Sequence, residues 1–344
     1  MRRRRAIGYY FSVISPKRIL VFRKSSLGDI ILTFPVLQTL KAEFPDAIVD
    51  YLTKSQYAPI IIHHPAVKNV IAFDSSLSFI NAASRIRNNG YDLFIDLQAN
   101  FQSLVLRSIL ISTRRVKYPK RRLARELVVR RPRMKLKVDH TVNAYLSPLK
   151  RLGIDVASTI PVLPVPEREG DLADKLIQAS FPADCSRLIA LCPGARHIEK
   201  RWPHFDKVAE RLLRNPLIGL MIISSEKDGF PANLGIENPR LVPIRDNEIM
   251  AVAALLSKCK ASVTNDSGLM HLACAVRTPV VAIFGPTNPR LGFSPTLPGS
   301  KIICDDVFCS PCSVHGKKRC GQREKYCFNN ITPERVADAV LDII

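Results

Sequence analysis

The stretch KASVTNDSGLMHLACAVRTPVVAIFGPT, from Lys260 to Thr287, decides the fold of this chain. Its pattern predicts a short buried strand over 261–264, a helix over 269–276 and a second buried strand over 280–284. The polar residues 265–268 form the turn between the first strand and the helix. Alternation of strand and helix is typical of a parallel sheet covered by helices, so we expect an α/β fold.

The turn after the first of these strands predicts a phosphate site. A helix N-terminus carries free N–H groups and a partial positive charge, and open α/β sheets bind ligands at the carboxyl ends of their strands. We therefore expect Asp266, Ser267 and Gly268, together with Thr287, to hold the phosphates of a nucleotide. The same residues also suit a simple capped turn, because Asp and Ser accept hydrogen bonds from the first N–H groups of a helix.

Length and charge restrict the class of protein. The chain has 344 residues, enough for two domains with real cores, and its 47% hydrophobic and 24% charged content is that of a globular protein. No apolar run reaches the length of a membrane span. The net charge of +21 predicts an anionic partner: nucleic acid, a phosphorylated substrate or a membrane surface. We interpret residues 1–16 as a basic N-terminal lead-in that lies on a membrane or forms a solvated tail.

Residues 17–160 are expected to form the first domain. A strand over Arg18–Arg23 is followed by a turn and by a helix over Ile30–Glu43, and the alternation continues to a strand at Leu93–Leu97. Asp29 therefore follows the carboxyl end of a strand, where open sheets bind their ligands. A carboxylate there suits a general base, and it equally suits a helix N-cap.

A strongly basic segment follows in the same domain. A solvated helix face usually mixes charges of both signs, whereas a cluster of one sign predicts a phosphate-binding surface. Lipid phosphates suit it at least as well as nucleic acid, because few aromatic side chains are interleaved for base stacking. Between residues 114 and 137 one acid, Glu126, stands among twelve basic residues: Arg114, Arg115, Lys117, Lys120, Arg121, Arg122, Arg125, Arg130, Arg131, Arg133, Lys135 and Lys137.

The second domain is expected over 171–330, after a proline-rich linker at 161–170. Lys200 lies at the mouth of the loop after a strand and is expected to contact phosphate. Glu226 lies just past the strand 218–224, where a carboxylate accepts from ribose hydroxyls or a base, or caps the next turn. Residues 331–344 form a last helix.

Several nucleotide motifs are absent from the sequence. There is no G-x-G dinucleotide fingerprint, no Walker A loop, no Asp-x-Asp metal clamp and no His-Glu-x-x-His. We therefore expect phosphates to be held by backbone N–H groups, a helix dipole and basic side chains, with no required cofactor and no obligatory Mg²⁺.

The segment 304–327 is rich in cysteine. Cys309 and Cys312 are two residues apart, and Cys320 and Cys327 follow, a set that suits a structural tetrahedral thiolate site. A local disulfide or reduced thiols are the alternatives, and nothing there indicates catalysis.

Taken together, the chain resembles glycosyltransferase family 9, the bacterial heptosyltransferases of lipopolysaccharide core assembly. The motifs that carry the resemblance occur in the family's order and span the chain from Arg18: 23–30 (RKSSLGDI), 96–103 (DLQANFQS), 193–196 (PGAR), 200–203 (KRWP), 224–226 (SSE), 265–272 (NDSGLMHL) and 284–287 (FGPT). The resemblance implies a GT-B fold of two Rossmann-like domains facing a central cleft, with the acceptor on the N-terminal and the nucleotide-sugar on the C-terminal domain. It also implies that the last helix crosses back to the first domain.

The resemblance implies an inverting, metal-independent heptosyltransferase. Asp29 would be the catalytic base, with Ser25, Ser26 and Gly28 lining the cleft beside it. ADP-heptose would be the donor. Its contacts would come from Lys200, Glu226, Asp266, Ser267, Gly268, His271 and Thr287.

By the same resemblance, the acceptor would be a phosphorylated glycolipid, Kdo-lipid A or heptosyl-Kdo-lipid A, received by the basic segment with Arg121, Arg122 and Arg125. The protein would then be cytoplasmic and peripheral on the anionic inner face of the cytoplasmic membrane, with no specific nucleic-acid partner. The basic stretch 107–137 has no residue-by-residue match to a family acceptor motif, and the four arginines at 2–5 are not a family feature.

Two other functions remain open on the sequence. One is a GT-B transferase with another nucleotide-sugar donor or glycan acceptor. The other is a non-enzymatic basic protein that binds phosphate or lipid through residues 114–137, against which Asp29, Lys200 and Asp266 count.

Overall fold

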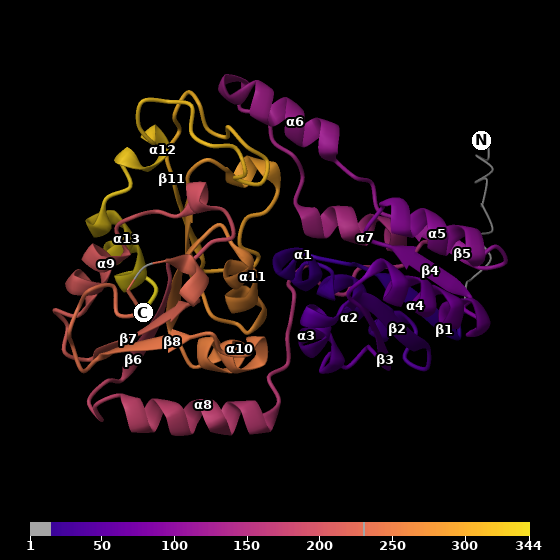
Figure 1. Ribbon diagram of the computed structural model, residues 1–344, viewed down its shortest axis with the longest axis horizontal. Helices are drawn as coiled ribbons and strands as arrows, with labels where there is room; N and C mark the ends of the chain where they lie inside the picture. Colours follow the sequence, from indigo (N-terminus) through magenta and orange to yellow (C-terminus); the bar gives the residue numbers. More distant parts are fainter. Residues whose placement is uncertain (1–14, 230) are drawn as a thin grey trace, which may run out of the picture.

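The structure is a computed structural model that describes residues 15–229 and 231–344. Most of the basic lead-in expected at 1–16 therefore lies outside the described residues. Two α/β domains lie side by side, each built on its own parallel sheet (Figure 1). Two such domains are the GT-B architecture that the family resemblance implied.

The first domain contains a five-stranded parallel sheet with the order β3-β2-β1-β4-β5. Its central strand is entirely apolar from Ile19 to Phe22 and is buried on both faces, as expected where helices cover a sheet on both sides. The edge strand β5 is basic and mostly exposed, so its composition did not predict a strand. The strands are β1 (Arg18–Phe22), β2 (Ile48–Lys54), β3 (Asn69–Phe73), β4 (Leu93–Asp96) and β5 (Arg114–Lys117).

The helix expected over Ile30–Glu43 is two helices in the structure. Pro35 has no N–H group to continue the first helix, and it occupies the first turn of the second helix, where none is needed. The first of the two, α1, is short and ends at the domain boundary. The helices of this domain are α1 (Leu27–Ile31), α2 (Phe34–Glu43), α3 (Ala58–Ile62), α4 (Ser76–Asn88), α5 (Phe101–Ile109), α6 (Arg122–Arg130) and α7 (Thr141–Arg151).

The second domain contains a six-stranded parallel sheet with the order β11-β10-β9-β6-β7-β8. The stretch that opened the sequence analysis lies at its centre as β9, α11 and β10, close to the predicted bounds. The strands are β6 (Arg187–Cys192), β7 (Ile218–Ser224), β8 (Leu241–Arg245), β9 (Ala261–Asn265), β10 (Val280–Phe284) and β11 (Lys301–Cys304). The helices are α8 (Glu167–Ser180), α9 (Phe205–Leu212), α10 (Ile249–Ser257), α11 (Gly268–Ala275), α12 (Tyr326–Asn329) and α13 (Pro333–Leu341).

The two domains share one continuous apolar core. A single cluster of buried side chains contains Ile31 and Tyr145 of the first domain together with Met270 and Ala273 of α11. Helices α1 and α11 pack on each other across the boundary. The loops at the carboxyl ends of both sheets therefore face each other.

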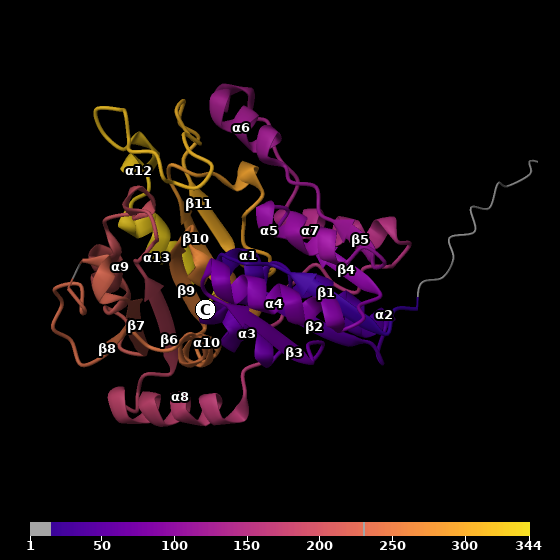
Figure 2. The ribbon, with the colours of Figure 1, turned by 45° about the vertical axis from the view of Figure 1, so that its right-hand side comes forward.

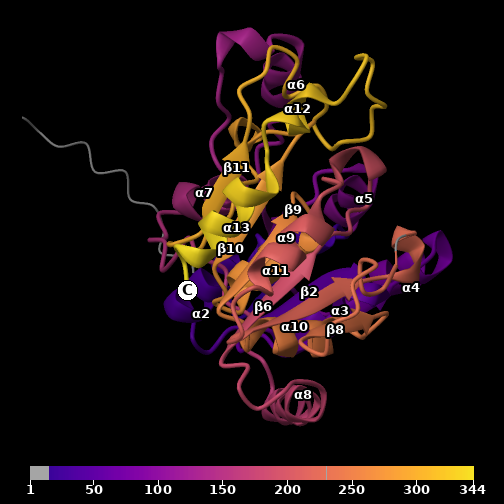
Figure 3. The same ribbon diagram turned by 90° about the vertical axis from the view of Figure 1, so that its left-hand side faces the viewer.

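Two boundaries differ from the prediction. The linker expected at 161–170 ends at Pro166, because Glu167 and Glu169 already form the first turn of α8, where acidic side chains favour the helix dipole. The last helix does not cross to the first domain. Helix α13 packs on α9, β9 and β10 of its own domain (Figure 3), since Val336, Ala337 and Val340 complete the apolar cover of that sheet.

Helix α6 extends away from the first sheet, at the top of the molecule, towards the segment after β11 (Figures 1 and 2). None of the helices in the described residues combines the length and apolar character required to cross a bilayer.

Candidate functional site

A cleft of about 990 Å³ lies between the carboxyl ends of the two sheets. The first domain contributes the loop after β1 and the start of α1, and the second contributes the loops after β6, β7, β8 and β9. Of the residues predicted from the sequence, those that line the cleft are Ser25, Ser26, Gly28, Asp29, Lys200, Asp266, Ser267, Gly268 and His271.

Asp29 lies at the first turn of α1, whose N-cap is Ser26. Its Oδ1 accepts a hydrogen bond from the Tyr145 hydroxyl at 2.8 Å, and its Oδ2 forms an ion pair with Arg23 at 2.8 Å and accepts from Ser26 Oγ at 3.1 Å. Burial would raise the pKa of Asp29, but Arg23, Tyr145 and Ser26 outweigh it and hold the pKa below its usual value. The side chain is thus an ionised carboxylate at neutral pH, and it remains partly open to the cleft.

Arg23, the ion-pair partner of this carboxylate, is itself buried and fixed in place. It is 7% exposed, and its guanidinium also donates to the carbonyl oxygens of Ser25 and Leu97. Burial alone would lower the pKa of Arg23, but the Asp29 carboxylate keeps it charged. Burial raises the pKa of Tyr145 well above its ordinary value, so its hydroxyl stays a donor to Asp29. The three side chains form one fixed, charged unit in the floor of the cleft.

The N-terminus of α11 faces the cleft from the second domain. Ser267 is the N-cap, but its hydroxyl does not cap the helix, and among the described residues its Oγ is buried without a hydrogen-bond partner. Ser224, at the end of β7, also has a buried Oγ without a partner there. Both hydroxyls line the cleft, beside the free N–H groups at the helix start. Such donors suit an anionic ligand.

Lys200 and Asp266 form an ion pair next to that helix start, with 2.7 Å between Nζ and Oδ2. The same Oδ2 accepts from Thr287 Oγ1 at 2.7 Å. Burial would raise the pKa of Asp266, but Lys200 and Thr287 hold it below its usual value. Asp266 therefore fixes the Lys200 ammonium group at the cleft wall, and Thr287, which does not line the cleft, supports Asp266 from behind.

His271 lies on α11 and is 5% exposed. Its ring packs against Gly28 of the first domain. Burial lowers the pKa of His271 to about 4, so the imidazole is neutral at physiological pH. Its Nδ1 is buried without a partner among the described residues. The ring thus contacts both halves of the site while adding no charge between Asp29 and Asp266.

Other predicted residues lie elsewhere. Glu226 is exposed and does not line the cleft; Ser225 and Asp228, next to it, do. The three arginines predicted to contact the acceptor are also outside the cleft. Their partners are as follows: Arg121 pairs with Asp139, Arg122 with Glu126, and Arg125 donates to the Leu291 carbonyl and to Thr141 Oγ1.

Arg125 also stacks on Phe293, with its guanidinium carbon 4.3 Å from the ring centroid. It therefore ties α6 to the second domain. An acceptor contact by Arg125 would have to replace these interactions.

Sequence analysis did not identify several residues of the site. Arg23 was part of a quoted motif but had no assigned role, and Tyr145 lies 116 positions from its partner Asp29. His315 and Lys317, on the segment after β11, line the cleft as well. No periodicity predicts these contacts, because Tyr145 reaches Asp29 through packing within the first domain, and His315 and Lys317 reach the cleft from an irregular segment.

All nine cysteines are free in the structure. Within residues 15–229 and 231–344, no three His, Cys, Asp or Glu side chains already converge as ligands of a metal ion.

Comparison with known proteins assigns this cleft to an enzyme family. The model of glycosyltransferase family 9 (heptosyltransferase) matches residues 79–321, more than half of the chain. A lipopolysaccharide heptosyltransferase 2 from Salmonella typhimurium is 29% identical over 306 residues, 81% of this chain and 85% of that protein. A lipopolysaccharide heptosyltransferase 1 from Pseudomonas aeruginosa is 27% identical over 352 residues, 93% of this chain and 96% of that protein.

The fold is similar to that of solved structures. The structure of E. coli ADP-heptose LPS heptosyltransferase II superimposes with a TM-score of 0.71 at 23% identity, and covers 95% of this chain and 98% of that one. A non-enzymatic phosphate-binding protein is therefore not supported. With its two facing sheets, its carboxylate and its helix N-terminus at one cleft, this chain is a glycosyltransferase and belongs to glycosyltransferase family 9.

Proposed function

We propose that the protein transfers a heptose from ADP-L-glycero-D-manno-heptose to the inner core of lipopolysaccharide, with inversion at the anomeric carbon. The observation that carries the proposal is the meeting of two groups in one cleft: the Asp29 carboxylate from the first domain and the start of α11 from the second. The relatives with 27–29% identity are named for lipopolysaccharide heptosyl transfer, and the E. coli structure is named for ADP-heptose.

Asp29 is proposed as the base. It accepts the proton of an acceptor hydroxyl as the hydroxyl oxygen forms its bond to the anomeric carbon, while the bond from that carbon to the ADP oxygen breaks on the opposite face. The hydrogen bonds of Tyr145 and Ser26 hold the carboxylate in one orientation. Arg23 keeps it ionised before reaction and balances its charge. The products of the step are the heptosylated acceptor, free ADP and a protonated Asp29.

The leaving diphosphate is proposed to lie at the second domain. Negative charge grows on it as the glycosidic bond breaks, and the N–H groups and dipole of α11, the Ser267 hydroxyl and Lys200 are the donors available to stabilise it. With these donors the proposed transfer needs no metal and no other cofactor. Asp228 and Asp246, rather than Glu226, are proposed to contact the nucleoside of the donor. These two carboxylates line the cleft, whereas Glu226 does not.

The acceptor is proposed to be Kdo-lipid A or heptosyl-Kdo-lipid A, approaching from the side of α6. This helix carries Arg122, and Leu123 beside it is 81% exposed. Basic and apolar side chains on one projecting helix suit the phosphates and acyl chains of an anionic bilayer. We thus propose a peripheral location on the inner face of the cytoplasmic membrane, and no specific nucleic-acid partner.

Nucleotide binding measured by calorimetry tests the donor. Titration with ADP, UDP and GDP, each with and without Mg²⁺, is expected to give the tightest binding for ADP and no dependence on the metal. A preference for UDP or GDP would contradict the donor and favour a GT-B transferase of another sugar. Incubation with ADP-heptose and each of the two acceptors, followed by mass spectrometry of the lipid, then identifies the acceptor that gains a heptose.

A further inference from the structure

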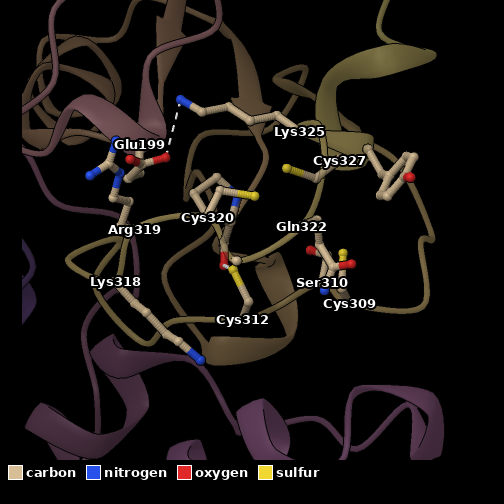
Figure 4. Close-up of a pocket in the computed structure, with 13 residues that line it drawn as sticks. Glu199, Cys309, Ser310, Cys312, Lys318, Arg319, Cys320, Gln322, Lys325 and Cys327 are labelled. Carbon is tan, nitrogen blue, oxygen red and sulfur yellow. Dashed lines mark hydrogen bonds and ion pairs between the residues drawn. The ribbon is translucent and has the colours of Figure 1, made fainter.

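A second, small pocket of about 80 Å³ lies next to the main cleft, within the segment that follows β11. Figure 4 shows its lining, in which four cysteine side chains border one space. The four are Cys309, Cys312, Cys320 and Cys327. The described part of the chain shows none of them in a disulfide.

The segment between β11 and α12, residues 305–325, has few features of its own that would stabilise a single conformation. It contains no helix or strand, and it exceeds the roughly 12–15 residues that irregular connections seldom exceed. Its only large apolar side chains besides cysteine are Val307, Phe308 and Val314, and Phe308 is 52% exposed. Burial of apolar surface therefore offsets little of the conformational entropy lost on ordering it. A segment of this kind needs another constraint, such as a disulfide or a bound metal ion.

The charges around the pocket favour a metal ion over disulfides. Lys318, Arg319 and Lys325 line the same space as the four thiols. One divalent ion with four thiolates carries a net charge of about minus two, which these cations balance. Two disulfides are neutral and would leave the basic side chains without a counter-charge, apart from the pair between Lys325 and Glu199 at 3.2 Å.

We propose that Cys309, Cys312, Cys320 and Cys327 bind one structural metal ion, Zn²⁺ or Fe²⁺, as a tetrahedral tetrathiolate site. These are the first-row ions that four thiolates favour. All four side chains border the pocket, so the ion is proposed to lie within it. Each cysteine binds the ion as its thiolate, and a thiol that is protonated beforehand loses its proton to solvent.

The site would fix one wall of the main cleft. Between the two cysteine pairs, Val314, His315 and Lys317 line that cleft. Gly316 lies against Lys200, and a Cβ at this position would overlap the Lys200 side chain. The first cysteine pair is also tied to the loop directly after β10: Ser310 Oγ donates to the Gly285 carbonyl at 2.8 Å, and Cys312 N donates to the Pro286 carbonyl at 3.0 Å.

Loss of the ion would therefore release the chain that confines the Lys200 side chain. This second part of the inference rests on the proposed function, because it assigns Lys200 to the donor.

Metal analysis of the full-length protein tests the first part without any assay of transfer. Protein purified without chelator is analysed for zinc and iron by mass spectrometry, and protein stripped of metal is titrated with Co²⁺ as a spectroscopic probe. We expect about one ion per chain and the visible bands of a tetrahedral Co²⁺ thiolate complex. Cys312→Ser and Cys327→Ser should lose both the bound ion and the Co²⁺ bands. Cys185→Ser should retain both, because Cys185 does not line the pocket.

Three results would overturn the site: no metal and no Co²⁺ bands in wild-type protein, equal metal content in all variants, or an intact mass lowered by disulfide formation. Because the Co²⁺ titration uses wild-type protein, it decides the matter even if a serine variant fails to fold.

Calorimetric binding of ADP to the metal-bound and stripped forms tests the second part. We expect the stripped form to bind ADP at least several-fold more weakly, and equal affinity would overturn the link to Lys200. Failure of ADP to bind either form contradicts the proposed donor but leaves the metal content as measured, so the two failures are distinguishable.

Discussion

The ring of His271 lies directly against the backbone of Gly28, and a Cβ on Gly28 would be 2.5 Å from His271 Cδ2. A second close contact joins the same two helices: a Cβ on Gly268 of α11 would lie 2.9 Å from Leu27 Cδ2 of α1. Two glycines, one on each helix, thus allow α1 and α11 to approach across the domain boundary. The proposed base and the proposed phosphate site share one cleft because of this approach.

Gly28→Ala is expected to separate the two helices and to reduce transfer by roughly tenfold or more, since a displacement near 1 Å at a reacting centre has large effects. His271→Ala combined with Gly28→Ala removes the clashing ring, so the double variant should recover part of the loss in stability that Gly28→Ala causes. The measurements are the transfer rate and the free energy of unfolding of the two single variants and the double variant.

Gly170→Ala is the matched control. Gly170 lies in α8, and an added Cβ there meets no atom within 4 Å, so alanine should be neutral or stabilising by up to about 1 kcal/mol. If Gly28→Ala is as well tolerated as Gly170→Ala, the close packing of α1 on α11 has no role in the site.

Asp29→Asn is expected to reduce kcat by about 10²- to 10⁴-fold, the usual contribution of a general base. ADP affinity should stay near the wild-type value, because the carboxylate lies on the acceptor side. Asp139→Asn, at an exposed ion pair with Arg121, is the control for loss of a carboxylate. An unchanged kcat in Asp29→Asn would contradict the assignment of Asp29 as the catalytic base.

The pH profile of the wild-type enzyme adds a test of the same carboxylate. The pKa of Asp29 is held below 3.8, so its proton-accepting form is fully populated above about pH 5. Activity should therefore show no decline from Asp29 between pH 8 and 5. An inflection near pH 6 that disappears in Asp29→Asn would contradict this assignment of its ionisation.

Lys200→Ala is expected to weaken ADP binding by roughly 10- to 100-fold, since a charge-assisted hydrogen bond contributes about 1.5–3 kcal/mol. It also leaves the buried Asp266 carboxylate without its cation. Lys207→Ala, an exposed lysine of α9 paired with Glu210 at 3.6 Å, controls for loss of a positive charge. Equal ADP affinity in the two variants, measured by calorimetry, would place the diphosphate away from Lys200.

His64 is expected to make stability depend on pH. Burial lowers its pKa from 6.5 to about 4, so between these values the unfolded chain takes up a proton that the folded protein does not. Stability should therefore fall as the pH falls from about 6.5 to 4, by up to about 3 kcal/mol for this group. His271 acts in the same direction.

Urea denaturation at pH 7 and pH 5 compares His64→Asn with His63→Asn, its exposed neighbour. The first variant should lose less stability on acidification than the wild type, and the second should behave like the wild type. Identical pH dependence in all three proteins would show that His64 is not the group responsible.

Much of the architecture could be predicted because it depends on local patterns. Buried strands such as β1, from Ile19 to Phe22, and β10, from Val280 to Phe284, are continuous apolar runs, and turn residues follow them. The pairing of Asp29 with Tyr145 could not be predicted, since it depends on the packing of α7 against the first sheet. Glu226 fits the motif, but the 3₁₀ turn that begins there directs its side chain to solvent and presents Ser225 and Asp228 to the cleft. The prediction that the last helix crosses to the first domain was also wrong. The apolar face of that helix packs on a complementary surface within its own domain.

The basic edge strand β5 has a consequence for solubility. One side of β5 pairs with β4, and no other strand of the described residues pairs with its far side. An unpaired strand edge offers its N–H and carbonyl groups to any second chain, and it is a common starting point of aggregation. Arg114, Arg115 and Lys117 are exposed along this edge, so two copies that approach there bring like charges together. The charges for which we propose an anionic partner surface would in this way also keep the sheet from growing into a fibre.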